Sequence, residues 1–183
     1  SAAAEKPLDL VSLSRGCKEL AAKYKEKLSA RLILETGRFL VCQAGTYVTP
    51  VVDKKVSRGK RYLLVQNTFN GFSRPSLGEF LGLYVDTADA AACEPLFTRE
   101  DAYAFGILGK SGEEEVVTIM GNLCTAADKM ASNVSLPKAE IGDILTVSNA
   151  GSYAYTLSPV HFANLPAPMQ VYVQPDGGYI VEE

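Results

Sequence analysis

Residues 46–56 read TYVTPVVDKKV, and residues 60–67 read KRYLLVQN. In both stretches apolar or β-branched residues alternate with polar ones, and Gly59 lies in the turn between them. Such alternation predicts strands, because successive side chains of a strand point to opposite faces of a sheet. The two stretches therefore indicate a chain that is mainly β.

Further strands are predicted along the rest of the chain. They are separated by turns rich in Gly, Pro, Asn and Asp, and comprise residues 82–86, 104–109, 115–121, 143–148, 170–174 and 179–181. The last two predict a hairpin across Pro175-Asp176-Gly177-Gly178. Many short strands at this spacing are typical of an antiparallel β-barrel or sandwich.

The beginning of the chain has a different pattern. Apolar residues recur every three or four positions from Leu10 to Leu28, which predicts one amphipathic helix over residues 8–29. The apolar run from Arg31 to Leu34 then predicts a short strand. A helix joined to a non-alternating strand is the repeating unit of a parallel α/β structure, so residues 1–37 are interpreted as the last unit of a structure that is otherwise missing.

The composition excludes several classes of partner. The 183 residues include 18 Lys and Arg and 21 Asp and Glu, a net charge of −3, without the basic cluster that holds nucleic acid. No apolar run approaches the roughly 20 residues of a membrane-spanning helix, and the start lacks a signal-peptide pattern. The cysteines, Cys17, Cys42, Cys93 and Cys124, form no CxxC pair. We expect a soluble, cytoplasmic protein with free thiols and no metal site, bound to neither nucleic acid nor membrane.

Three short motifs each follow a predicted strand. They are Glu35-Thr36-Gly37-Arg38, the segment GNLCTAAD at residues 121–128, and Gly151-Ser152-Tyr153. Taken singly, each has a plain structural interpretation: a charged turn, a buried cysteine that acts as a small apolar residue, and a turn of small residues.

In their order and spacing the three motifs resemble the C-terminal portion of the fold-type III pyridoxal-phosphate decarboxylases, which include the diaminopimelate and ornithine decarboxylases. In that family one strand ends in Glu-Pro-Gly-Arg, a later one in Gly-Pro-x-Cys-(Glu/Asp/Thr)-x-x-Asp, and a third in Gly-Ala-Tyr. The stretch from Arg38 to Gly59 is most similar to the subgroup that acts in secondary metabolism and polysaccharide export, which includes decarboxylases of carrier-linked amino acids. The resemblance implies that residues 1–37 are the last helix and strand of a truncated (β/α)8 barrel, and residues 38–183 the C-terminal β domain.

The resemblance also implies a pyridoxal 5′-phosphate cofactor and a role for each matching residue. Glu35 would face the pyridine nitrogen of the cofactor and keep it protonated. Arg38 and Tyr153 would bind the cofactor phosphate. Cys124 would donate the proton that replaces the lost carboxylate at Cα.

Three more positions bear on the substrate. Diamino-acid decarboxylases of the family have Glu or Asp after the motif cysteine, whereas this chain has Thr125. Arg74, within Phe72 to Leu77, resembles an arginine that meets a distal carboxylate in diaminopimelate-type enzymes; a surface arginine at a turn fits the same residues equally well. With Asp128 as a third contact, we expect an amino-acid substrate, free or carrier-linked.

The family's imine-forming lysine, glycine-rich phosphate loop and stacked histidine belong to an N-terminal barrel that this sequence does not match. We therefore expect an inactive isolated chain, whether a fragment, a proteolytic product or a separately encoded subunit, and a homodimer with shared active sites when complete. Two alternatives remain: a non-catalytic regulatory or binding homologue that keeps the fold and dimer surface, and an unrelated β-barrel ligand-binding module. The joint presence of Glu35, Arg38, Cys124, Asp128 and Tyr153 favours the enzyme, because a non-catalytic relative would have no chemical reason to keep them together.

Overall fold

The computed structural model describes residues 9–83 and 102–182. By its internal contacts the chain divides into two compact units, Ser1–Gly37 and Arg38–Glu183. That the first unit is the end of an α/β barrel stays a prediction.

The first unit contains one regular helix, α1 (Leu10–Tyr24), which begins after Asp9. The Asp9 carboxylate accepts a 2.9 Å hydrogen bond from the backbone N–H of Ser12 and so caps the first turn. The helix is shorter at both ends than the predicted 8–29. Its apolar side chains, including Leu13 and Leu20, are exposed.

The strand predicted at residues 31–34 is wrong. These residues have no regular secondary structure, and Leu32, Ile33 and Leu34 are exposed. A strand is stabilised by hydrogen bonds to a neighbouring strand, and the described part of the first unit offers none. An apolar run alone is therefore not sufficient to form a strand.

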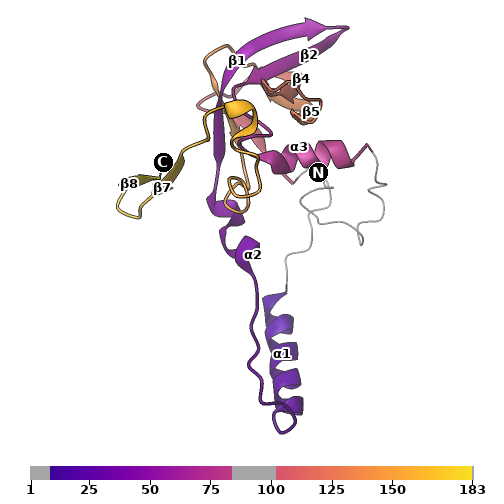
Figure 1. The fold of residues 1–183 in the computed structure, drawn as a ribbon, viewed down its shortest axis with the longest axis vertical. Helices are drawn as coiled ribbons and strands as arrows, with labels where there is room; N and C mark the ends of the chain where they lie inside the picture. The colour runs from indigo at the N-terminus through magenta and orange to yellow at the C-terminus, as the bar shows by residue number, and fades with distance from the viewer. Residues whose placement is uncertain (1–8, 84–101, 183) are drawn as a thin grey trace. The chain divides into compact units, whose positions relative to one another are not determined.

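The second unit contains a six-stranded mixed sheet in the order β3-β6-β1-β2-β4-β5. Figure 1 labels four of its strands, β1, β2, β4 and β5. Its strands are β1 (Tyr47–Ser57), β2 (Lys60–Val65), β3 (Phe105–Ile107), β4 (Glu114–Met120), β5 (Lys129–Pro137) and β6 (Ile144–Val147). The outer strands β3 and β5 contact each other, so the sheet forms a nearly closed barrel. Edge closure of this kind removes most unpaired strand edges.

The predicted β-barrel class is confirmed, with one difference in strand direction. The pairs β1–β2, β1–β6, β3–β6 and β4–β5 are antiparallel, but β2 and β4 run parallel. Parallel neighbours need a crossover connection. Helix α3 (Ser73–Leu81) lies in that connection and was not predicted.

The core follows from the alternation of side chains along the strands. Alternate residues of β1, β2 and β6 point inward, among them Val51, Val65 and Leu145. The core cluster continues with Phe72, which packs against Tyr47 with ring centres 5.7 Å apart. These side chains exclude water from the inside of the barrel, which is the main stabilising term for a sheet of this size.

Two further elements differ from expectation. Strand β5 was not predicted, and its Asn133 has a left-handed φ of 55° that interrupts the strand pattern. Of the strand predicted at 82–86, Gly82 and Leu83 instead bond back to the end of α3, and residues 84–86 lie outside the described residues.

The predicted C-terminal hairpin is confirmed as β7 (Gln170–Val173) and β8 (Tyr179–Glu182). Gly177, in the turn between the strands, has a φ of +86°, a conformation that suits glycine. Short helical segments α2 (Gly37–Val41), η1 (Cys42–Ala44) and η2 (Phe162–Asn164) complete the chain.

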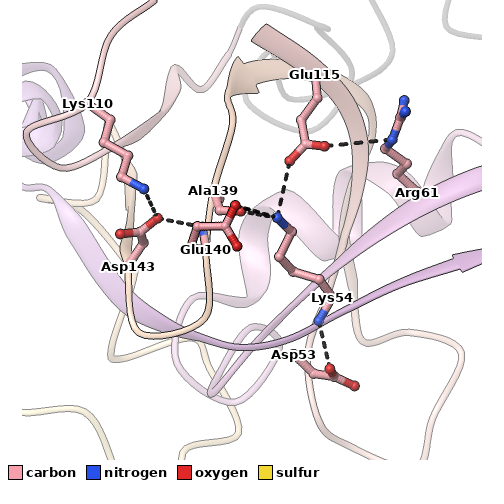
Figure 2. Close-up of polar contacts among 8 residues, drawn as sticks. All are labelled: Asp53, Lys54, Arg61, Lys110, Glu115, Ala139, Glu140 and Asp143. Atoms are coloured by element: carbon pink, nitrogen blue, oxygen red, sulfur yellow. Dashed lines mark hydrogen bonds and ion pairs between the residues drawn. The ribbon is translucent and has the colours of Figure 1, made fainter. Parts of the chain in front are cut away.

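Hydrogen bonds and ion pairs connect the turn between β5 and β6 to the rest of the barrel (Figure 2). Lys54 of β1 donates to the carbonyl of Ala139 and pairs with Glu140 at 3.4 Å. Asp143 accepts from Lys110 at 2.5 Å and from the backbone N–H of Glu140 at 2.6 Å. The Lys110 ammonium and these hydrogen bonds lower the pKa of the Asp143 carboxyl.

Replacing the core side chain of Leu145 tests the position of the core. Leu145 is 0% exposed on β6, so Leu145→Ala should lower the free energy of unfolding by about 2–5 kcal/mol. Val48, on the neighbouring β1, is 55% exposed, and Val48→Ala should cost less than about 1 kcal/mol. Urea unfolding of both variants measures the difference. Equal losses would contradict the described core.

Candidate functional site

Two arginines lie beside the same aromatic ring in the second unit. The guanidinium carbon of Arg38 is 5.4 Å from the ring centre of Tyr153, and that of Arg74 is 5.1 Å from it. Both distances are within the range of cation–π contact. The cluster of Arg38, Arg74 and Tyr153 is called the arginine–tyrosine cluster below.

The arginine–tyrosine cluster is strongly positive. Arg74 is only 3% exposed, and burial lowers the pKa of its guanidinium, as does the nearby charge of Arg38. Two cations placed together at a partly desolvated position repel each other. An anion that reached them would reduce this repulsion and accept their hydrogen bonds.

A close approach of two backbone segments holds Tyr153 in this cluster. The N–H of Ala150 donates to the carbonyl of Gly45 at 2.9 Å, and that of Gly151 to the carbonyl of Cys42 at 3.0 Å. A Cβ at Gly151 would lie 1.8 Å from the carbonyl oxygen of Val41, so only glycine fits there. Tyr153 itself has a left-handed φ of 62°, which costs energy for a bulky residue and is common at functional sites.

Helix α3, which contains Arg74, is held in place by hydrogen bonds and an ion pair at both of its ends. At the start, the backbone N–H of Ser73 donates to the hydroxyl of Ser158 at 2.8 Å. At the other end, the Glu79 carboxylate accepts from Ser132 and pairs with Lys129 at 2.9 Å. The interpretation of Arg74 as a surface arginine at a turn is therefore wrong, because Arg74 is buried in the first turn of a helix.

Sequence reasoning missed two neutral groups near the arginines. Burial raises the pKa of the Cys42 thiol, and the charges of Arg38 and Arg74 act against this. Burial raises the pKa of Tyr103 to about 12, against the effect of Arg74. Cys42 follows Arg38 by four residues, one helical turn, which was the available signal.

The residues of the second motif form a separate group. Cys124 is exposed, and the Thr125 hydroxyl accepts a 3.3 Å hydrogen bond from the N–H of Ala127. Asp128 is buried and accepts hydrogen bonds from Thr68, Phe69 and Leu123. Burial raises the pKa of the Asp128 carboxyl, and the backbone hydrogen bonds act against this.

Of the predicted site residues, the structure brings Arg38, Arg74 and Tyr153 together, and holds Cys124, Thr125 and Asp128 in one loop. Glu35 is an exposed residue of the first unit, and its predicted contact with the cofactor stays a prediction.

Over residues 9–83 and 102–182, no three His, Cys, Asp or Glu side chains are grouped so that they could hold a metal ion. No helix of that part of the chain has the length and apolarity needed to cross a membrane.

Known proteins are similar in sequence to much of this chain. L-glutamyl-[BtrI acyl-carrier protein] decarboxylase of Niallia circulans is 31% identical over 177 residues, which cover 96% of this chain and 38% of that protein. The diaminopimelate decarboxylase of Campylobacter jejuni is 30% identical over 126 residues, covering 68% of this chain and 26% of that protein.

The fold is shared with solved structures. The crystal structure of diaminopimelate decarboxylase from M. jannaschii has a TM-score of 0.71 at 24% identity, and the match covers 92% of this chain and 34% of that one. The chain thus spans between a quarter and two fifths of the length of these relatives. Residues 38–151 match the family described as the pyridoxal-dependent decarboxylase C-terminal sheet domain. Because this match includes more than half of the chain, the chain belongs to the pyridoxal-dependent decarboxylase family through its C-terminal sheet domain.

Proposed function

We propose that this chain is the C-terminal part of a pyridoxal-phosphate-dependent amino-acid decarboxylase, in which it binds the cofactor phosphate and supplies the proton donor. The observation that supports this most is the arginine–tyrosine cluster, where two guanidinium groups lie within 5.4 Å of the Tyr153 ring centre.

The residues of this cluster fit a phosphate group. A phosphate monoester has close to two negative charges at neutral pH and three strong acceptor oxygens. Each guanidinium offers donors in a planar fork, and the Tyr153 hydroxyl adds another. Tyr153 is 46% exposed, so part of this residue is accessible to a ligand. When bound, the cofactor supplies an aromatic ring that accepts the electron pair released at Cα.

The other motif residues act on the reacting atoms in this proposal. Glu35 holds the proton on the pyridine nitrogen by accepting its hydrogen bond. Cys124, with an exposed thiol, delivers a proton to Cα after carbon dioxide leaves. Arg38 and Tyr153 orient the cofactor through its phosphate, and the buried charge of Arg74 strengthens that site.

The proposed assembly includes parts that this chain does not supply. An N-terminal barrel, in a longer chain or another chain, would provide the lysine that holds the cofactor. Two copies of the complete protein would then form a dimer with shared active sites. The isolated chain is proposed to be inactive.

The proposed substrate is an amino acid that lacks a free distal amine, such as a carrier-linked one. Thr125 follows Cys124 and has no charge with which to bind a distal ammonium group. The name of the Niallia circulans relative describes a carrier-linked glutamyl substrate, which agrees with this proposal.

The isolated chain should not bind the cofactor covalently. Pyridoxal phosphate added to the 183-residue chain should give no visible absorbance band that survives dialysis, because no lysine of this sequence matches the family's imine-forming one. A stoichiometric band that disappears when one lysine is replaced would contradict the proposal.

In the complete enzyme, Arg38→Ala and Cys124→Ala should separate binding from proton transfer. Arg38→Ala removes charged hydrogen bonds to phosphate and should weaken cofactor binding by about 10- to 100-fold. Cys124→Ala should lower kcat by about 100-fold or more with little change in cofactor affinity. Arg61→Ala, on β2 and paired with Glu115, serves as the control arginine. Equal losses of cofactor affinity in both variants would exclude Cys124 as the proton donor.

The residue after the cysteine should control the substrate. A diamino acid would place an ammonium group near Thr125 without a counter-charge, at a cost of several kcal/mol in a desolvated site. Thr125→Glu should therefore raise kcat/KM for lysine or ornithine relative to a glutamate-type substrate by about tenfold or more. Thr125→Gln is the control, because glutamine has nearly the same size as glutamate but no charge. A wild-type preference for a diamino acid would overturn this proposal.

A further inference from the structure

Asp128 joins two segments that are far apart in the sequence. Its Oδ1 accepts hydrogen bonds from the Thr68 hydroxyl and from the N–H of Phe69, the latter at 3.0 Å. Its Oδ2 accepts from the N–H of Leu123 at 2.6 Å. Both oxygens are thus occupied, and the residue is 1% exposed. These contacts are called the Asp128 clasp.

On one side, the Asp128 clasp fixes the backbone around Cys124. The residue before the thiol, Leu123, donates to the Asp128 carboxylate. The residue after it, Thr125, accepts from the Asp128 N–H at 3.1 Å. The N–H of Gly121 closes the loop on the Asp128 carbonyl at 2.9 Å. The thiol is therefore set between two residues that Asp128 holds.

On the other side, the clasp fixes the turn that begins α3. The Thr68 carbonyl accepts hydrogen bonds from the N–H groups of Gly71 and Phe72, at 3.0 and 2.7 Å. Phe72 is buried in the core and is followed directly by Ser73 and Arg74 of α3. A shift of this turn would move the helix that holds Arg74.

Gly121 independently indicates that the clasp has a tight geometry. A Cβ at this position would lie 2.3 Å from Oδ2 of Asp128 and 2.4 Å from Oγ1 of Thr68. No side chain can stand there while the Asp128–Thr68 contact exists. The clasp thus explains why the motif at residues 121–128 begins with glycine.

We propose that Asp128 is a positioning residue that sets Cys124 relative to α3, and that Thr68 is its partner in this role. This deepens the proposed function and rests on it. The expected contact of Asp128 with substrate stays a prediction; its burial and the hydrogen bonds that both of its oxygens accept favour the positioning role.

Hydrogen exchange tests the clasp without any catalytic readout. Amide exchange is measured by NMR on the 183-residue chain. Asp128→Asn places an amide nitrogen, itself a donor, against one of the groups that donate to the carboxylate. Thr68→Val removes one donor while keeping the shape of the side chain. Both should speed exchange of the Leu123 or Phe69 amide by at least about tenfold. Thr68→Ser should restore protection, and amides in the middle of α1, such as that of Leu20, should not change.

Kinetics of the complete enzyme test the positioning role. Thr68→Val, which changes no predicted ligand, should lower kcat by about 10- to 100-fold at unchanged KM, because a small displacement of the thiol weakens proton transfer. Thr68→Ser should keep near-normal kcat. A raised KM in Asp128→Asn together with normal kinetics in Thr68→Val would show a substrate ligand and overturn the proposal.

The two tests separate this inference from the proposed function. Unchanged amide exchange in Thr68→Val and Asp128→Asn would overturn the clasp itself. Faster exchange in a complete protein that has no decarboxylase activity would overturn the proposed function, and with it the catalytic purpose of the clasp. Thr68→Val alters one buried hydroxyl and decides the outcome even where Asp128→Asn fails to fold.

Discussion

The antiparallel register between β1 and β6 decides where the phosphate-binding candidates meet. Tyr47 pairs with Val147 and Pro50 with Ile144, so the start of β1 adjoins the end of β6. The segment with Arg38 leads into β1, and the segment with Tyr153 follows β6. A slip of one residue would reverse the inward and outward faces of the strands. The close approach of Gly45 and Gly151 then continues the pairing beyond the sheet.

The parallel pairing of β2 and β4 brings together the two segments that form the Asp128 clasp. Because the two strands run in the same direction, the segments that follow Val65 and Met120 both begin at the same end of these paired strands. One segment contains Thr68, and the other contains Gly121 and Asp128. The clasp between them is therefore a consequence of strand direction, and an all-antiparallel barrel would not place these two loop starts together.

Much of this fold could be predicted from the sequence, and the failures have physical reasons. Alternating residues identified β1, β2 and β6, because each has one buried face. Strand β4 was also predicted, although its consecutive residues Val117, Thr118 and Ile119 are all buried. Strand β5 was not predicted because Asn133 breaks its alternating pattern. Helix α3 was not predicted because Pro75 and Gly78 have low helix propensity and the helix is short. Among site residues, Arg38 and Tyr153 belong to recognisable motifs. Thr68 and Tyr103 belong to none and depend on contacts between distant segments.

Several locally unfavourable features gather at the arginine–tyrosine cluster. Arg38 and Arg74 repel each other, Arg74 is desolvated, and Tyr153 has a left-handed backbone. Each lowers the stability of the domain, and none is needed to close the barrel, whose core is formed by side chains from all six strands. Such a combination is typical of a site shaped for a ligand, since a bound dianion would oppose the repulsion and use the donors. The same burial that weakens the isolated domain strengthens attraction to an anion, because a lower local dielectric increases both effects.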